Sequence, residues 1–428
     1  MTATARLLAF ANGPILMPAP VRAAALMLLG DTLAMGAAGS TAPGADGVLA
    51  AAQGWGTGAA VPVLGRAVRL PAPAAAFANG FQIHCLEWDA VHEPAVVHAM
   101  SVVTAALHAA CHARGGVGRE DALAALVVGV DIACMLGLAA TTPLKFFRPA
   151  TAGLIGAALA VARVAGLPPE RFGDVLGLAH AQCAGTMQAH VEGSIALPLQ
   201  VAAAARAAIT AVDLVAAGLT GPQDALMGPF GYFPLFEGGD PSALVAQLGS
   251  RWLVPEISIK PWPSGRASHA TLAALEGLGA ADVRAIAAEV PPLIARLVGR
   301  PWVEGMSPAY ARLCLPFLVA LMLTDGRIDP RRFTSANFDD PGLRALGTRL
   351  SVSVDGNPDL NALGPQRFRV TLVDGSVRDV LVPATLGSPA NPLTASAHGA
   401  KLAFAASLAA VPGTVDADPL TALSGTPA

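Results

Sequence analysis

Residues 84–98, HCLEWDAVHEPAVVH, gather an unusual number of ionisable side chains. These are His84, Glu87, Asp89, His92, Glu93 and His98. In the whole chain of 428 residues only 13% are charged, while 54% are hydrophobic. Ionisable groups that cluster in apolar surroundings have shifted pKa values and are candidates for acid–base chemistry. The stretch therefore predicts a functional site. The alternative is that Asp89 and His92 form a helix cap and His98 is an ordinary core histidine.

Pro94 divides this stretch into two structural parts. Proline fits the first turn of a helix but disrupts a helix interior. We therefore expect Asp89 and His92 in a loop or a short preceding helix, and His98 in the first turns of the following helix. The unpaired N–H groups at a helix entrance favour anions, so an anionic ligand is expected here.

Length and charge narrow the class of protein. A chain of 428 residues predicts two domains, each able to bury a core. The net charge of −3 shows no excess of basic residues, which argues against a nucleic-acid partner. A mean hydropathy of +0.54 raises the question of a membrane protein. However, Arg206 and Asp213 interrupt the apolar run 199–219, and Asp31 interrupts 23–39. We predict helices buried between other helices and no membrane partner.

Targeting and cysteine patterns predict a cytoplasmic protein. The N-terminus lacks the basic, apolar and small-residue regions of a signal peptide. The cysteines are odd in number and have no short paired spacing, which predicts neither a disulfide framework nor a zinc ribbon; they are Cys85, Cys111, Cys134, Cys183 and Cys314. His108 and His112 have the spacing of a zinc pair, but the helix dipole explains their place in a last turn better. No metal and no cofactor are predicted.

Periodicity predicts a mainly α fold in two parts. Helices are expected at 22–39, from the key stretch to Arg114, and at 119–140, 151–165, 170–190, 196–218 and 241–249. Mixed elements follow, with strand-like stretches at 255–261, 291–298, 349–354, 367–373 and 377–382 and helices at 264–279 and 308–325. Asp374-Gly375 is a strong hairpin signal. A helix is expected at 396–410, and mobile residues at the end of the chain. We therefore predict an all-helical bundle domain of residues 1–253, completed by 387–428, with an inserted α+β lid domain of residues 254–386.

The stretch NGFQIHCLEWDAVHEPAVVH, residues 79–98, resembles the motif of the MmgE/PrpD family. That family includes 2-methylcitrate dehydratase, cis-aconitate decarboxylase and iminodisuccinate epimerase. The resemblance implies active-site roles for Asp89 and His98, and, in the segment IKPWPSGRASH (259–269), for Lys260 and His269. It also implies a helical domain made from both chain ends with an α+β lid between them. A homodimer is also expected, because the resemblance implies one and because the chain has an excess of apolar helices.

Several positions depart from the pattern that the resemblance implies. Arg148 and Ala150 stand where most relatives carry His and Thr, in FFRPAT, residues 146–151. Leu197 replaces a Lys, Gln200 a His and Phe317 a Tyr. Because arginine binds carboxylates in two-point geometry but cannot shuttle protons, these changes favour anion binding over proton transfer. We expect Arg148 to replace the missing cation. The substrate is then expected to differ from 2-methylcitrate and cis-aconitate, and to be smaller or to carry an apolar arm against Leu197 and Phe317.

The combined prediction is a cofactor-free lyase, a dehydratase or decarboxylase. It would abstract a proton α to a carboxylate of a small di- or tricarboxylate, because fixed cations stabilise the charge that develops. The predicted catalytic residues are Asp89, His92, His98, Lys260 and His269, and the predicted substrate-binding residues are Arg148, Thr151, Arg266 and Gln200. An isomerase or epimerase on the same scaffold, or a non-catalytic carboxylate-binding descendant, are the alternatives.

Overall fold

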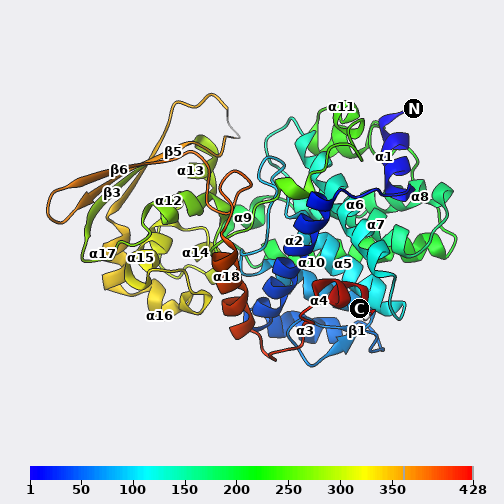
Figure 1. The fold of residues 1–428 in the computed structure, drawn as a ribbon, viewed down its shortest axis with the longest axis horizontal. Helices are drawn as coiled ribbons and strands as arrows, with labels where there is room; N and C mark the ends of the chain where they lie inside the picture. The colour runs from blue at the N-terminus through cyan, green and yellow to red at the C-terminus, as the bar shows by residue number, and fades with distance from the viewer. Residues whose placement is uncertain (360–361, 427–428) are drawn as a thin grey trace.

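The computed structural model describes residues 1–359 and 362–426, and the chain is mainly α-helical, as predicted (Figure 1). The first part contains α1 (Ala3–Asn12), α2 (Ala19–Ala38), α3 (Ala45–Gln53), α4 (Ala72–His84), α5 (Ala99–Ala113), α6 (Arg119–Leu138), α7 (Arg148–Val164), α8 (Phe172–His180), α9 (Gln188–Glu192), α10 (Ala196–Ala216) and α11 (Ser242–Val245). Short turns η1 (Gly39–Thr41), η2 (Pro169–Arg171) and η3 (Phe233–Glu237) join them, with a small antiparallel pair β1 (Val61–Pro62) and β2 (Arg69–Leu70). The region 170–190, predicted as one helix, is instead broken between α8 and α9.

The centre of this part is formed by α5, α6, α7 and α10, whose facing residues are small and buried. A Cβ atom at Gly156 of α7 would lie 2.2 Å from the carbonyl oxygen of Gly129 on α6. The two helices therefore approach at backbone distance, which is why alanine and glycine dominate them. This close packing fixes the N-terminal ends of α5 and α7, the two helix ends that carry His98 and Arg148.

Three helical stretches are long and apolar enough to cross a membrane by length and composition: Ala19–Thr41, Arg119–Leu138 and Ala196–Ala216. Charged residues interrupt each of these stretches, namely Asp31, Asp131, and Arg206 with Asp213, and the absence of a membrane partner stays a prediction. In the folded chain, 61%, 83% and 50% of their most apolar windows are buried inside the protein. Their apolar surface is thus largely used in packing against other helices.

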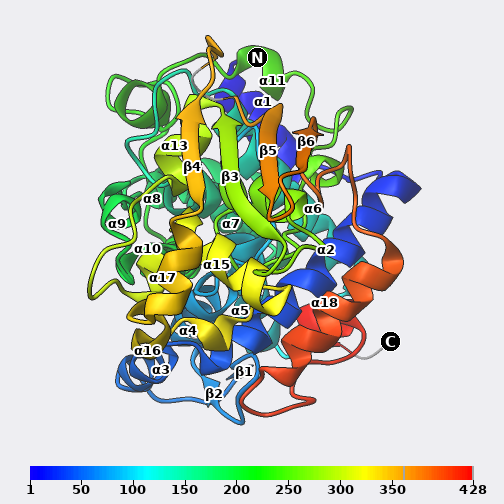
Figure 2. The ribbon, with the colours of Figure 1, turned by 90° about the vertical axis from the view of Figure 1, so that its left-hand side faces the viewer.

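The second part contains a four-stranded sheet in the order β4-β3-β5-β6, formed by β3 (Val283–Val290), β4 (Leu350–Val354), β5 (Gln366–Leu372) and β6 (Val377–Val382). β4 runs parallel to β3, while β5 is antiparallel to both β3 and β6. Helices of this part are η5 (Arg266–Ser268), α12 (His269–Ala274), α13 (Pro292–Val298), α14 (Pro308–Ala311), α15 (Leu315–Asp325), η6 (Pro330–Arg332), α16 (Ser335–Phe338) and α17 (Pro341–Gly347). The preceding turn η4 (Val254–Glu256) packs on α2 and α6 of the helical part. The sheet stands at the outer side of this part, with the helical part behind it in Figure 2.

The predicted hairpin at Asp374-Gly375 is confirmed, since it joins β5 to β6. Two strand predictions were wrong. The segment 255–261 makes only an isolated bridge, between Val91 and Ser258, and residues 292–298 form helix α13 while the strand precedes them. Pro292 explains the second error, because it begins a helix and a short apolar run does not distinguish helix from strand.

The C-terminal residues return to the helical part. α18 (Ala395–Ser407) packs on α2, where Lys401 Nζ lies 2.7 Å from Asp31 Oδ1 and His398 Nε2 lies 3.1 Å from the same oxygen. The expected mobile end is instead helix α19 (Pro419–Ser424), which buries Leu423 against α5 and α6. The carbonyl of Ala422 in α19 lies 2.9 Å from His112 Nε2. Exact domain boundaries and a closing motion of the lid stay predictions.

Candidate active site

The functional loop lies between α4 and α5. His84 is the last residue of α4, and His98 is the N-cap residue of α5, one position before the helix rather than in its first turns. Glu87 and Val96, with φ of 54° and 52°, are non-glycine residues in the left-handed region. Such strained conformations persist only where the surrounding structure enforces them, and they concentrate at functional sites.

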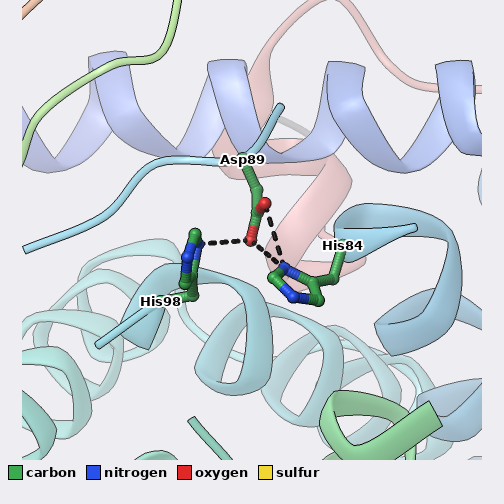
Figure 3. Close-up of side chains that lie close together, drawn as sticks. All are labelled: His84, Asp89 and His98. Carbon is green, nitrogen blue, oxygen red and sulfur yellow. Dashed lines mark hydrogen bonds and ion pairs between the residues drawn. The ribbon is translucent and has the colours of Figure 1, made fainter. Parts of the chain in front are cut away.

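Asp89 contacts two imidazoles, that of buried His84 and that of His98, whose side chain is 12% exposed (Figure 3). Nδ1 of His84 donates to both carboxylate oxygens, at 3.1 and 2.9 Å. Nδ1 of His98 lies 3.0 Å from Oδ2 but falls short of hydrogen-bond alignment, so it is a close polar contact. Ser101 Oγ of α5 also donates to Oδ2. The predicted pairing of Asp89 with a histidine is thus present, together with a second imidazole.

The two histidines on this carboxylate have opposite electrostatic character. Burial lowers the pKa of each, but at His84 the carboxylates of Asp89 and Glu87 outweigh it and the pKa is raised. At His98 burial prevails over Asp89, with Lys260 adding to it, and the pKa is lowered. Burial alone would raise the pKa of Asp89, but the two imidazoles hold it well below its usual value. Of the two imidazoles, His84 is therefore the one whose charged form the site favours beside Asp89, while the site favours the neutral form of His98.

Lys260 joins this cluster through Glu87. Its Nζ donates to the side-chain Oε2 and to the backbone oxygen of Glu87, both at 3.0 Å. Glu87 Oε1 in turn lies 3.5 Å from His84 Nε2. Burial would raise the pKa of Glu87, but Lys260 and His84 lower it to about 2. Lys260, Glu87, His84, Asp89 and His98 thus form one continuous chain of contacts that crosses between the two parts of the protein.

A cavity opens beside this chain of contacts, between the two parts of the protein. It encloses about 770 Å³, including its mouth to solvent. His98 and Glu87 line it from the loop, Arg148 from α7 and Arg266 from η5. Asp89 and Lys260 lie behind this wall, since both are fully buried and neither lines the cavity. A substrate in the cavity would therefore meet His98 directly and Lys260 only through Glu87.

Arg266 is fully engaged with protein groups, contrary to its predicted role as a carboxylate ligand. Nε and Nη2 donate to Glu93 Oε1 at 3.0 and 2.8 Å, and Nη2 also to the Thr385 carbonyl at 3.2 Å. Nη1 donates to the Leu386 carbonyl at 2.6 Å and to His269 Nδ1 at 3.3 Å. A guanidinium has five N–H donors, so this arginine has none left for a substrate.

Arg148 lines the cavity but is not the uncompensated cation that was expected. Its Nε and Nη2 donate to the two carboxylate oxygens of Glu237, at 3.0 and 3.1 Å. Nη1 donates to the Ala95 carbonyl at 2.9 Å. This two-point ion pair is buried on both sides, so Glu237 already balances the charge. Two of the five N–H donors remain without a partner in the part of the chain that the structure describes.

His92 and His269 were predicted as catalytic, but neither lines the cavity. His92 Nδ1 accepts from the Ala95 N–H at 3.1 Å and its Nε2 lies 3.6 Å from Glu256 Oε2. It therefore closes the loop as a cap, the alternative considered from the sequence. His269 accepts from Arg266 at Nδ1, so its Nε2 bears the proton and donates to Ser264 Oγ at 3.1 Å. Burial and Arg266 hold the pKa of His269 well below its usual value.

The remaining predicted positions divide between the cavity wall and the core. Leu197 lines the cavity, as the proposed contact for an apolar arm requires. Phe317 does not: it is fully buried in the second core, edge-on to Trp302. Thr151 is fully buried inside α7 and Gln200 donates to the Thr186 carbonyl at 3.3 Å, and neither lines the cavity. The positions of these two side chains outside the cavity wall give no support to their predicted contact with substrate, which stays a prediction.

Three functional candidates were not among the predicted site residues. His84 and Glu87 belong to the dense ionisable stretch, so the signal for them was present, but only the fold shows that they connect Asp89 to Lys260. Glu237, the partner of Arg148, lies 89 positions along the chain in η3 and carried no sequence signal. Long-range ion pairs of this kind follow from the tertiary structure alone.

The ligand atoms of His84, Asp89 and His98 lie within 4.8 Å of one another, a spacing that would also suit a metal ion. Coordination needs ring nitrogens without a proton, whereas the raised pKa of His84 favours its protonated form. The hydrogen-bonded cluster therefore accounts for the arrangement without an ion, and the absence of a cofactor stays a prediction.

Comparisons with known proteins connect this site to a family. A family model described as the MmgE/PrpD N-terminal domain matches residues 15–244, and the MmgE/PrpD C-terminal domain matches residues 262–414. A cis-aconitate decarboxylase of Homo sapiens is 27% identical over 330 residues, which covers 72% of this chain and 67% of that protein. A cis-aconitate decarboxylase of Aspergillus terreus is 25% identical over 405 residues, 87% of this chain and 82% of that protein. A cis-aconitate decarboxylase-like protein of Aspergillus oryzae is 30% identical over 280 residues, covering 61% and 58%.

Proposed function

The chain belongs to the MmgE/PrpD family, and on that premise we propose that its cavity catalyses proton transfer at the carbon next to a carboxylate of a small organic acid. The relatives support a lyase of the dehydratase or decarboxylase type. The resemblance implies a di- or tricarboxylate as substrate. Both reactions pass through a carbanion whose charge spreads onto the carboxylate oxygens, so both need one neutral base and fixed positive charge.

The observation that carries this proposal is the contrast between His84 and His98 on one carboxylate. A pair of like groups whose pKa values are pushed apart by their surroundings identifies the acid–base assignment. The lowered pKa of His98 leaves it neutral, and it lines the cavity. Its Nδ1 proton faces Asp89, so the lone pair of Nε2 is free to accept a proton from substrate. Asp89 then stabilises the imidazolium that forms.

The proton balance of the step is simple. In dehydration, Nε2 of His98 takes the proton from the α carbon, the electron pair forms the new C=C bond and breaks the bond to the hydroxyl of the neighbouring carbon, and the imidazolium returns its proton to that oxygen, which leaves as water. In decarboxylation, the bond to the departing CO₂ supplies the electron pair, and His98 passes to the resulting carbanion a proton that it first takes up from solvent. Lys260 is the less suitable donor, because it is fully buried behind Glu87.

Deuterium exchange tests this function. In D₂O, the protein should exchange the α proton of an accepted acid or release its dehydrated or decarboxylated product, and NMR would report both. Exchange with inversion and without product would identify an epimerase instead. A ligand that binds tightly but neither exchanges nor reacts would overturn the proposal in favour of a binding protein. Treatment with EDTA is expected to leave the rate unchanged, because the proposed step needs no metal.

The pH dependence of kcat/KM gives a further prediction. The base must be neutral, and the pKa of His98 is lowered from its ordinary value, which is about 6.5 for histidine. Activity should therefore fall only below that ordinary value as the pH decreases, when His98 becomes protonated. A rate profile with its acidic limb centred above about pH 7 would contradict the assignment of His98 as the base.

A further inference from the structure

The walls of the cavity are mainly hydrocarbon. Phe147, Met187 and Leu197 line it from the helical part, and Leu293, Leu297 and Leu313 from the other part. All are buried or half-buried. A ligand that fills such a space loses apolar surface to the protein. Groups on the ligand that stay charged next to these walls would instead lose their hydration without gaining partners, which is unfavourable.

The charged side chains of the wall are already paired. Arg266 lies 2.8 Å from Glu93, and Glu87 lies 3.0 Å from Lys260. Arg148 has its own two-point partner in Glu237, at 3.0 Å. The wall therefore offers no surplus positive charge to a ligand.

The other ionisable groups near the cavity add no cation to its wall. Burial, together with Arg300, lowers the pKa of the wall residue His190 to about 4, so it is neutral, as is His98. In the described ranges 1–359 and 362–426, Arg300 and Arg312 have no carboxylate partner, but neither of them lines the cavity. A ligand with three carboxylates would thus bring three negative charges into an apolar space whose wall arginines are already ion-paired.

One anchoring point remains. Arg148 faces the cavity and keeps two N–H donors without a protein partner, enough for one carboxylate. We propose that the site takes an organic acid with a single carboxylate and an apolar arm, with the carboxylate at Arg148 and the arm against Leu197 and Leu297. As a substrate class this rests on the proposed function, since His98 must reach the carbon next to that carboxylate. As a binding preference it can be measured without turnover.

Calorimetric titration of the intact protein with two acids tests the preference. The probes are trans-2-hexenoate, with one carboxylate and a propyl arm, and cis-aconitate, with three carboxylates and no arm. Hexenoate is expected to bind at least about tenfold more tightly. Equal or tighter binding of cis-aconitate overturns the proposal, and so does the absence of saturable hexenoate binding. Preferred binding of hexenoate, together with no deuterium exchange of the saturated analogue hexanoate, whose α carbon bears ordinary protons, would refute the proposed function and leave this preference standing.

Variants that add net positive charge to the cavity wall should shift the binding preference towards cis-aconitate. Glu237→Gln keeps the shape of the partner and releases the charge of Arg148, so cis-aconitate should bind at least about tenfold more tightly than to the unaltered protein. Glu120→Gln removes an exposed carboxylate that is paired with Arg22 and should change neither affinity.

Because Glu237 is buried, Leu197→Lys repeats the test from another helix of the cavity wall, α10, with Leu197→Met as its uncharged control. If neither charged variant strengthens cis-aconitate binding relative to its control, charge balance does not set the preference and the proposal is wrong.

Discussion

Replacing His98 with glutamine is expected to lower kcat by about 10²- to 10⁴-fold, the usual contribution of a positioned general base. Glutamine retains polarity and similar size but cannot accept and return a proton. KM should change much less, because His98 is assigned to proton transfer rather than to holding the carboxylate. Steady-state kinetics on any acid that the protein turns over, together with the rate of α-deuterium exchange, would measure both effects.

His112→Gln is the matched control for this variant. His112 lies at the other end of the same helix, with Nε2 2.9 Å from the Ala422 carbonyl and no place in the cavity wall. It should retain ordinary kcat even if its melting temperature falls slightly. A His98 variant that keeps more than about a tenth of kcat would show that the base is another residue. The buried Lys260 would be the next candidate.

Replacing Asp31 with alanine is expected to destabilise the protein by about 3–5 kcal/mol, the cost of leaving a buried charge without its partner. Lys401 Nζ lies 2.7 Å from Asp31 Oδ1, donates to the Trp88 carbonyl at 3.3 Å, and is buried together with Asp31. Burial lowers the pKa of this lysine while Asp31 opposes the change. The pair fastens α18 to α2 beside the functional loop. Denaturant unfolding would give the free-energy difference directly.

Two controls separate this effect from the removal of an arbitrary carboxylate. Asp46→Ala removes a side chain that is 88% exposed in its pair with Arg66, and exposed pairs contribute at most about 1 kcal/mol. The double variant Asp31→Leu with Lys401→Met removes both charges and should recover much of the lost stability. A loss below about 1 kcal/mol for Asp31→Ala would mean that the ammonium finds another partner or loses its proton.

The position of the functional loop and its role as a candidate site could be predicted from residues close together in the chain. Pro94 separates the loop from α5, and the density of ionisable groups around Asp89 marks the site, because both signals depend only on neighbours in sequence. The hairpin between β5 and β6 is of the same kind, since a two-residue turn signal is complete in itself. Where a short apolar run stood alone, as at 292–298, the same reasoning chose the wrong element.

The ion pairing of the charged side chains in the site could not be predicted from neighbours in the sequence. From the sequence, Arg148 was expected to be a free cation, but in the fold it pairs with Glu237, 89 positions along the chain. Arg266 was expected to bind a carboxylate of the substrate, but Glu93 and two backbone carbonyls already accept its hydrogen bonds. Phe317 occupies a position where the resemblance implies a functional residue but lies in a core. Each of these errors concerns the direction of a side chain or the identity of the protein groups that it contacts.

By itself, the sequence determined that this protein is mainly helical, that its family is MmgE/PrpD, and that Asp89 and His98 belong together, because periodicity, turn chemistry and motif spacing are local properties of the chain. Only the tertiary structure decided that His98 rather than Lys260 faces the cavity, that His84 carries the charge beside Asp89, and that glutamates neutralise the arginines of the wall. The physical reason is that burial and ion pairing are set by segments distant in sequence. The strength of a charge inside a protein depends on those surroundings far more than on the residue that carries it.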